Sequence, residues 1–263
     1  MLHVFDVFHN RKREAGEVGL EIEVEGADLP QTITGWRSEV DASLRGESLE
    51  YVLREPVSRE QVPICLKKIT KAYARCGSRI ANSYRCSTHV HINVQELTMK
   101  EVYSFILLYA MFEPFLVKYC GEHREGNLFC LRIGDAEGIV PALRLAATTG
   151  EFNQLGSPLL RYGALNVTAL AKYGSLEFRA MRGTEDMAAI GTWVKLLLAL
   201  KDAAVAYKNP VTIIEDISGR GARGLAYHVF GGLLKEVPLP EEWEDTLFNS
   251  MRDLQDIAYC GEG

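Results

Sequence analysis

Hydrophobic and polar residues alternate strictly along residues 16–26. Aliphatic side chains stand at every second position, at Val18, Leu20, Ile22 and Val24, and glycine or glutamate stands between them. Because successive side chains of a strand point to opposite faces of a sheet, this period of two predicts a strand with one apolar and one polar face. Shorter segments of the same kind predict strands at about 48–53, 88–94, 164–167 and 175–179.

Two helices are predicted from residues that cap helix N-termini. Ser58 stands three residues before Gln61, and Thr98 stands three residues before Glu101, which is the spacing of a capping box. These pairs predict helices from there to about residues 75 and 119.

The remaining helices are predicted from proline, glycine and acidic residues. Pro141 and Gly150 bracket a short helix, because proline suits a first turn and glycine suits the position after a last turn. Acidic residues after Thr184 favour another helix start, running to about residue 206. Further helices are expected after residues 210, 223 and 240.

The predicted elements favour an α+β fold. Strands combined with helices of very unequal length, without regular alternation, indicate a mostly antiparallel sheet. No internal repeat, low-complexity segment or linker marks a domain boundary. We therefore expect one domain over residues 1–263, with its motifs in about 16–182 and a helical C-terminal part over about 184–263.

Composition places the chain among globular proteins. Its 263 residues are 47% hydrophobic and 24% charged, and 29 basic against 35 acidic residues give a net charge of −6. A protein that binds nucleic acid through counterion release usually has a basic excess, so nucleic acid is not the expected partner. The short basic run at residues 11–13 is most simply a solvated segment.

Cysteine and hydropathy patterns favour a cytoplasmic location. The six cysteines form no CxxC pair, which argues against a zinc ribbon and indicates scattered thiols in a reducing compartment. The N-terminus lacks the pattern of a secretory signal. The most apolar stretch, at residues 105–112, ends at Glu113 and Pro114, short of the roughly 20 residues that span a bilayer.

Three of the predicted strands carry pairs of charged or titratable side chains at positions i and i+2. The pairs are Glu21 with Glu23, His89 with His91, and Glu177 with Arg179, which therefore project from the polar faces of their strands. Each pair alone has an ordinary interpretation: an acidic surface strand, two hydrogen-bonded histidines, or a neutralising ion pair.

Taken together, the three pairs favour one sheet face that holds hard cations and a polyanion. Magnesium prefers carboxylate oxygens and usually arrives with substrate phosphates, and arginine offers a planar fork that matches a phosphoryl group. A zinc site would more typically have a first shell rich in His or Cys. Magnesium with ATP therefore fits this face better than zinc. A further carboxylate, Glu50, lies in an apolar strand-like run that could also be a plain edge strand.

These residues resemble the amidoligase family, in the superfamily of glutamine synthetase and glutamate-cysteine ligase. Five motifs carry the resemblance, in the order of the family and over about residues 16–182: Gly19-Leu-Glu-Ile-Glu, Asp41-x-Ser-Leu followed by Leu49-Glu50, His89-Val-His91, Arg161-Tyr-x-x-Leu-Asn166, and Leu176-Glu-Phe-Arg179. The resemblance implies a curved antiparallel sheet of the glutamine synthetase catalytic-domain type. ATP and two or three magnesium ions, or manganese, would lie on its concave face, with helices on the convex face.

The resemblance also implies metal-binding residues. Glu21, His89 and Glu177 would hold the metal that bridges the transferred phosphoryl group, and Glu23 and Glu50 would hold a second metal nearer the substrate. Asp41 matches the family motif and would serve the substrate side, although Glu47 is closer to Glu50 in sequence and could compete for the same metal.

Further residues would contact the phosphates and the substrate. His91 and Arg179 would contact the phosphates of ATP, and Arg161 would contact the phosphoryl group or the substrate carboxylate. Asn166 would orient a neighbour or the substrate. By this resemblance Glu177, Arg179 and Arg161 are the catalytic candidates.

The implied reaction joins a carboxylate to an amine. The γ-phosphoryl of ATP is transferred to the carboxylate of a small molecule or peptide, and an amine attacks the acyl phosphate to give an amide, ADP and phosphate. Two alternatives remain: a catalytically inactive nucleotide-binding or interaction module of the same fold, and a metal-dependent hydrolase that uses His89 and His91 without ATP. The substrates, the pathway and the oligomeric state stay open.

Overall fold

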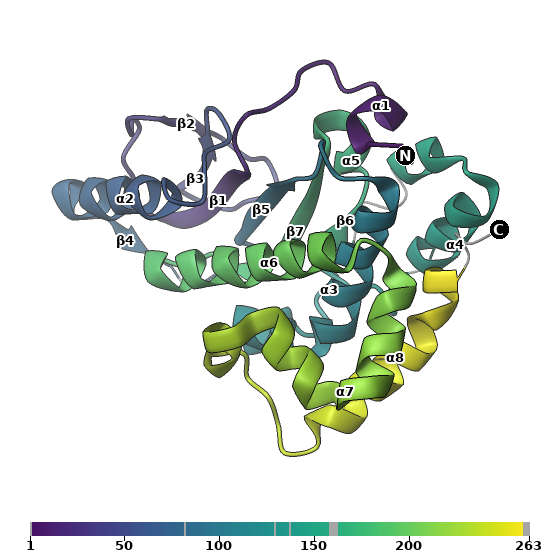
Figure 1. The fold of residues 1–263 in the computed structure, drawn as a ribbon. Coiled ribbons are helices and arrows are strands. Elements are labelled where there is room, and N and C mark those ends of the chain that lie inside the picture. Colours follow the sequence, from purple (N-terminus) through teal and green to yellow (C-terminus); the bar gives the residue numbers. More distant parts are fainter. Residues whose placement is uncertain (1, 82, 129, 137, 158–162, 260–263) are drawn as a thin grey trace.

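The sheet is antiparallel and open. The computed structural model describes the chain except for residues 1, 82, 129, 137, 158–162 and 260–263. The strand order is β2-β3-β1-β5-β7-β6, with β4 paired to β1 (Figure 1). The described strands are β1 (Val18–Ala27), β2 (Trp36–Glu39), β3 (Ser48–Leu53), β4 (Arg79–Ile80), β5 (Ser87–Asn93), β6 (Leu165–Asn166) and β7 (Ser175–Arg182).

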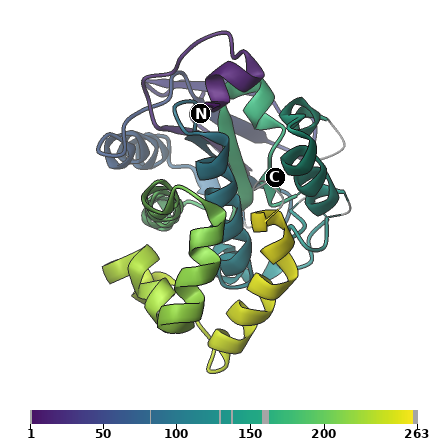
Figure 2. The same ribbon diagram turned by 45° about the vertical axis from the view of Figure 1, so that its right-hand side comes forward.

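Helices cover one face of this sheet in two layers. In Figures 1 and 2, α2, α3 and α6 lie against the strands, and α7 and α8 lie beyond α3 and α6. The described helices are α1 (Val4–Phe8), α2 (Val62–Cys76), α3 (Met99–Cys120), α4 (Ile139–Thr149), α5 (Ala169–Tyr173), α6 (Met187–Tyr207), α7 (Pro210–Phe230) and α8 (Trp243–Tyr259), with short 3-10 turns between some of them. The prediction of a mixed fold with an antiparallel sheet is confirmed.

Strand β1 separates an apolar face from a polar one. Val18, Leu20 and Ile22 are fully buried under the helices, as their alternation predicts. The neighbouring strands fix the register of the other face: Glu21 pairs with His89 of β5, and Glu23 pairs with Glu50 of β3. The polar positions of separate strands therefore lie side by side, opposite the helical layer.

Both hydrogen bonds of the predicted capping box are present at the start of α3. The backbone N–H of Glu101 donates to the Thr98 hydroxyl, and the Glu101 carboxylate accepts from the backbone N–H of Thr98. The predicted box at residues 58–61 is wrong as a helix start. The backbone N–H of Ser58 donates to the Gln61 side chain, but residues 58–61 form a turn and α2 begins at Val62. Pro63 in the first turn fixes this start, because proline suits positions whose N–H has no helical partner.

Helix α3 is the central helix of the core. It continues through Glu113 and Pro114, where the sequence predicted an end to the apolar stretch, and is long and apolar enough to cross a membrane by length and composition. Of its most apolar window, 83% is buried inside the protein. Its hydrophobic residues are therefore covered by the sheet and the other helices.

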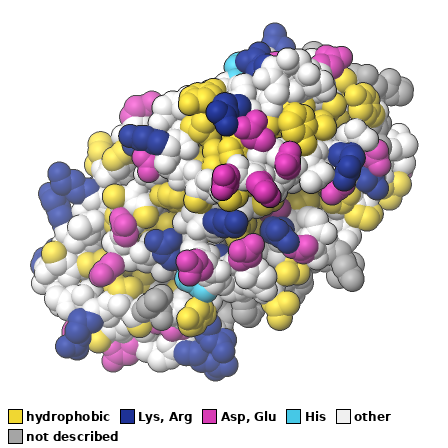
Figure 3. Space-filling model, turned by 90° about the horizontal axis from the view of Figure 1, so that it is seen from below, with side chains coloured by type: hydrophobic (Ala, Val, Ile, Leu, Met, Phe, Trp, Pro, Cys, Tyr) yellow, Lys and Arg dark blue, Asp and Glu magenta, His cyan; other side chains and the backbone are white. Residues whose placement is uncertain are grey.

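The C-terminal part is helical, as predicted. Asp186 caps α6 by accepting from the N–H groups of Ala188 and Ala189. The helices expected after residues 210 and 223 form the two halves of α7, which is kinked at Gly221 with φ 75° and ψ 169°. On the side shown in Figure 3, acidic, basic and hydrophobic side chains are intermixed, without a large area of one charge.

Candidate active site

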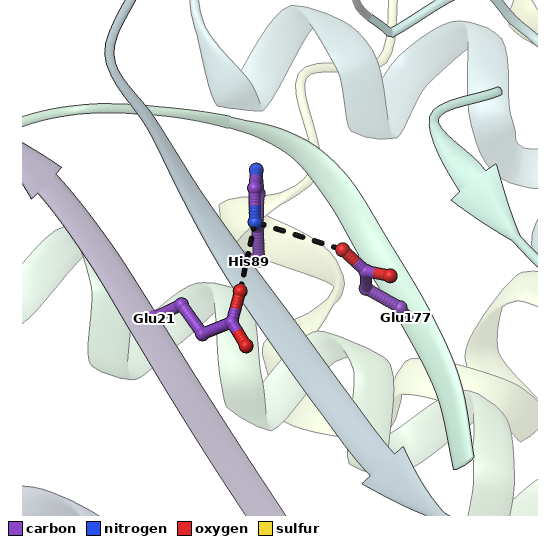
Figure 4. A group of neighbouring side chains, drawn as sticks. All are labelled: Glu21, His89 and Glu177. Carbon is purple, nitrogen blue, oxygen red and sulfur yellow. Dashed lines mark hydrogen bonds and ion pairs between the residues drawn. The ribbon is translucent and has the colours of Figure 1, made fainter. Parts of the chain in front are cut away.

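Three titratable side chains meet on the open face of the sheet. Glu21 of β1, His89 of β5 and Glu177 of β7 point toward one another in Figure 4. His89 Nδ1 lies 3.2 Å from Glu21 Oε2 and 3.6 Å from Glu177 Oε1. One ligand atom from each residue lies within 4.8 Å of the others, so this group could hold a metal ion.

A second group shares His89 with the first. Glu23, Glu50 and His89 also offer ligand atoms within 4.8 Å of one another. His89 Nε2 lies 3.7 Å from Glu23 Oε1, on the opposite side of the ring from Glu21. The structure therefore brings together all five residues that were predicted to hold metals, in two adjoining groups.

Negative charge is concentrated around Glu50. Burial, together with repulsion from Glu21 and Glu23, raises the pKa of Glu50 to about 7. A divalent cation would relieve this repulsion, and the oxygen-rich donor set matches the preference of magnesium. The described residues therefore fit the metal that the family resemblance implies.

Glu21 and His89 shift each other's pKa. Burial opposes the charged form, but the hydrogen bond with His89 and the nearby charge of His91 hold the pKa of Glu21 well below its ordinary value. Burial likewise disfavours imidazolium, yet the hydrogen bond with Glu21 and the charges of Glu23 and Glu177 raise the pKa of His89.

Glu177 is oriented by its neighbours. Asn166 Nδ2 donates to Glu177 Oε2 at 2.5 Å, and the amide oxygen of Asn166 accepts from both the N–H and the hydroxyl of Thr168. Arg179 Nη1 donates to Glu177 Oε1 at 3.1 Å. Asn166 therefore contacts a neighbouring residue of the site, and a contact with the substrate stays a prediction.

An acidic hollow of about 470 Å³ lies over both groups. It is lined by Glu21, Glu23, Asp41, Ser43, Glu50, Arg85, Ser87, His89, Glu177 and Arg179. Asp41 therefore lies on the same side as Glu50, whereas Glu47 is exposed and outside this lining.

A basic hollow of about 370 Å³ lies beside the acidic one on the same face. Glu21 lines both hollows, and His91 lines the basic one. The cationic side chains of its lining are Arg11, Lys12, Arg37, Arg54 and Lys172, which outnumber the acidic Glu14, Glu21 and Glu55. Lys12 forms ion pairs with Glu14 and Glu55. Arg11 and Lys12 of the basic run line this hollow, and all three residues of the run are exposed, as expected for a solvated segment.

The predicted phosphate contacts lie on either side of Glu21. His91 Nε2 is 3.5 Å from Glu21 Oε1 and opens to the basic hollow, whereas Arg179 opens to the acidic one. Arg161 lies outside the described residues, so its role stays a prediction.

The chain matches the model of a known protein family. The family model described as "Putative amidoligase enzyme" matches residues 55–201, which is more than half of the chain. The chain belongs to this amidoligase family. The matched region contains His89, His91, Asn166, Glu177 and Arg179, whereas Glu21, Glu23, Asp41 and Glu50 precede it. A search of the curated proteins found no match.

Several residues of the site were not predicted. Ser87 and Ser175 contact the two histidines, with Ser87 Oγ 2.8 Å from His89 Nε2 and Ser175 Oγ 3.1 Å from His91 Nδ1. Their positions, two residues before a predicted ligand on the same strand, were a signal that could have revealed them. The cations of the basic hollow come from separate segments, for which the sequence offered no common pattern.

Proposed function

We propose that this amidoligase is an ATP- and magnesium-dependent carboxylate–amine ligase that forms an amide through an acyl phosphate. The proposal is carried by the position of Glu21. This residue belongs to the candidate metal group with His89 and Glu177, and it also lines the basic hollow. The triphosphate of ATP requires both features: carboxylates that hold magnesium, and cations that bind the remaining phosphate charge. A sheet of the glutamine synthetase type, with this face as the concave one, is part of the proposal.

The two hollows suggest where the reactants lie. The nucleotide would occupy the basic hollow, with His91 near its phosphates and its γ-phosphoryl group over Glu21, His89 and Glu177. The acceptor carboxylate and the amine would enter through the acidic hollow, which Asp41 and Arg85 flank.

The chain's own residues would then overcome electrostatic repulsion. When bound, magnesium neutralises charge on the phosphates and stabilises the transferring group. Glu21, His89 and Glu177 would hold one ion, and Glu23 and Glu50 would hold a second. Arg179, which lies against Glu177, would balance the charge that develops when a carboxylate attacks the phosphoryl group. The amine then attacks the acyl phosphate, and phosphate leaves.

The cellular setting belongs to the same proposal. All five described cysteines are free, which agrees with a reducing cytoplasmic compartment. The partners would be a small-molecule or peptide carboxylate and an amine, rather than a membrane or nucleic acid.

Calorimetric titration tests the proposal before any substrate is known. ATP and a non-hydrolysable analogue are titrated into the protein with magnesium and again with EDTA. We expect micromolar binding that requires magnesium and that Glu21→Gln abolishes, whereas Glu241→Gln, an exposed matched control, retains it. The absence of nucleotide binding under both conditions would refute the proposal.

Two further results separate the alternatives. Binding without ADP release, across a screen of carboxylates and amines, would favour the nucleotide-binding module. Zinc or manganese in the purified protein, with hydrolysis that needs no ATP, would favour the hydrolase.

A further inference from the structure

The hydroxyl of Ser87 lies between two groups that compete for its proton. Ser87 Oγ is 2.7 Å from Glu23 Oε2 and 2.8 Å from His89 Nε2. The backbone N–H of Ser87 also donates to Glu23 Oε2, at 2.7 Å. Ser87, Glu23 and His89 are all buried, so these contacts exchange little with water.

The hydrogen-bonding capacity of serine decides between the two. A serine hydroxyl has one proton to donate and lone pairs to accept with. A carboxylate accepts a stronger hydrogen bond than a neutral ring nitrogen, so the Ser87 proton goes to Glu23. The Ser87 oxygen then faces His89 Nε2 as an acceptor, which requires a proton on Nε2.

We propose that Ser87 is a positioning residue for His89. It keeps the proton of the His89 ring on Nε2, so that Nδ1 is the nitrogen that ligates the metal together with Glu21 and Glu177. Nδ1 is the ring nitrogen that faces both carboxylates of that group. Hydrogen bonds to the distal ring nitrogen commonly fix the tautomer and orientation of a metal-binding histidine. The proposal rests on the proposed function only in that this group holds a divalent cation.

The proposal has a consequence for the second group. His89 could serve Glu23 and Glu50 only through a lone pair on Nε2, which Ser87 removes. The second ion would then depend on Glu23 and Glu50 together with oxygens of the substrate or nucleotide. We therefore expect one tighter and one weaker metal site in the protein without nucleotide.

Histidine NMR measures the tautomer directly. The magnesium-loaded protein is labelled with ¹⁵N-histidine, and long-range ¹H–¹⁵N spectra are recorded. Among its six histidines, the resonances of His89 and His91 are assigned from those that disappear in His89→Gln and His91→Gln. We expect a proton on His89 Nε2 and none on Nδ1. A proton on Nδ1 with a bare Nε2 would overturn the proposal, and this wild-type result does not depend on any Ser87 variant folding.

Manganese binding, followed by electron paramagnetic resonance, measures the consequence. We expect Ser87→Ala to weaken the tighter site by about tenfold or more, and Ser87→Thr, which keeps the hydroxyl, to restore affinity within a few-fold. Ser175→Ala is the matched control: it removes a buried hydroxyl from His91, so it should shift the resonances of His91 and leave those of His89 unchanged. Wild-type affinity in Ser87→Ala would overturn the proposal.

The results also distinguish this proposal from the proposed function. Failure of the wild-type protein to bind manganese would overturn both. Tight binding with the expected tautomer, but no ATP binding, would refute the ligase alone.

Discussion

Two glutamates of this protein are buried in different surroundings. Glu177 lies on the open face of the sheet and is 6% exposed, whereas Glu113 lies in the central helix α3 and is 2% exposed. Glu177 accepts hydrogen bonds from Asn166 and Arg179 and lies beside His89. Glu113 accepts one hydrogen bond, from the backbone N–H of Ile133, and its Oε1 has no partner within the part of the chain that the structure describes.

The difference shows that burial alone does not make a carboxyl group functional. Burial raises the pKa of Glu113 to about 8, and the hydrogen bond from Ile133 only partly opposes it. A carboxyl group with this pKa is mostly protonated at neutral pH, which does not suit a ligand of a metal ion. Glu177 instead accepts hydrogen bonds from two donors and offers a ligand atom within 4.8 Å of those of Glu21 and His89, which suits a carboxylate that ligates metal. Substitutions at the two positions should consequently affect different properties.

The largest effect is expected from Glu177→Gln. Removing one carboxylate from the group with Glu21 and His89 should lower magnesium-dependent ADP release by on the order of a thousandfold, because charge on the phosphoryl group is no longer stabilised. The thermal unfolding temperature should change little, since glutamine keeps the shape of the side chain. Turnover equal to that of Glu241→Gln would contradict the site assignment.

Glu113→Gln should instead change stability, in a pH-dependent way. Between about pH 4.5 and 8 the unfolded chain releases this proton while the folded protein keeps it, so the wild-type protein loses stability as pH rises through this window. The variant lacks this loss, and its free energy of unfolding relative to wild type should grow by on the order of 3 kcal/mol from pH 5 to pH 8.

Urea denaturation of both proteins at pH 5 and pH 8 measures this difference in the free energy of unfolding. ADP release by Glu113→Gln should stay at the wild-type level. Parallel changes in the wild-type protein and in Glu113→Gln would show that the pKa of Glu113 is the same in the folded and unfolded protein.

Asn166→Ala should have the smallest of the three effects. It removes the amide that orients Glu177 and leaves every proposed metal ligand in place. Manganese affinity should fall by about tenfold, or about 1.4 kcal/mol, as measured by electron paramagnetic resonance. Asn153→Ala, at an exposed position, is the control. An unchanged affinity would show that Glu177 needs no such support.

The sequence predicted the site residues better than the surroundings of the site. Alternation along β1, β5 and β7 was enough to place Glu21, His89 and Glu177 on polar faces, because side-chain direction in a strand is a local property. Their mutual distances depend on register and strand order, which only the resemblance implied. The strands Trp36–Glu39 and Arg79–Ile80 were not predicted, because four and two residues are too few to show a period.

The basic hollow was missed for a related reason. Arg37 comes from β2, Arg54 follows β3 and Lys172 comes from α5, so the chain separates cations that the fold assembles. The helix start at Ser58 failed because proline and the preceding turn outweighed a local capping signal. The predicted end of α4 at Gly150 and the predicted cap of α3 at Thr98 were correct, because each of these signals depends only on neighbouring residues.

Strand order also determines when the site can form during synthesis. β5 and β7 are neighbours in the sheet, yet α3, α4 and α5 lie between them in the chain. Pairing of this kind has high contact order and tends to make folding slow. A nascent chain that ends before β7 lacks Glu177 and cannot complete the group with Glu21 and His89. A metal that binds this group would therefore recognise only the finished fold, and would stabilise it against unfolding by mass action.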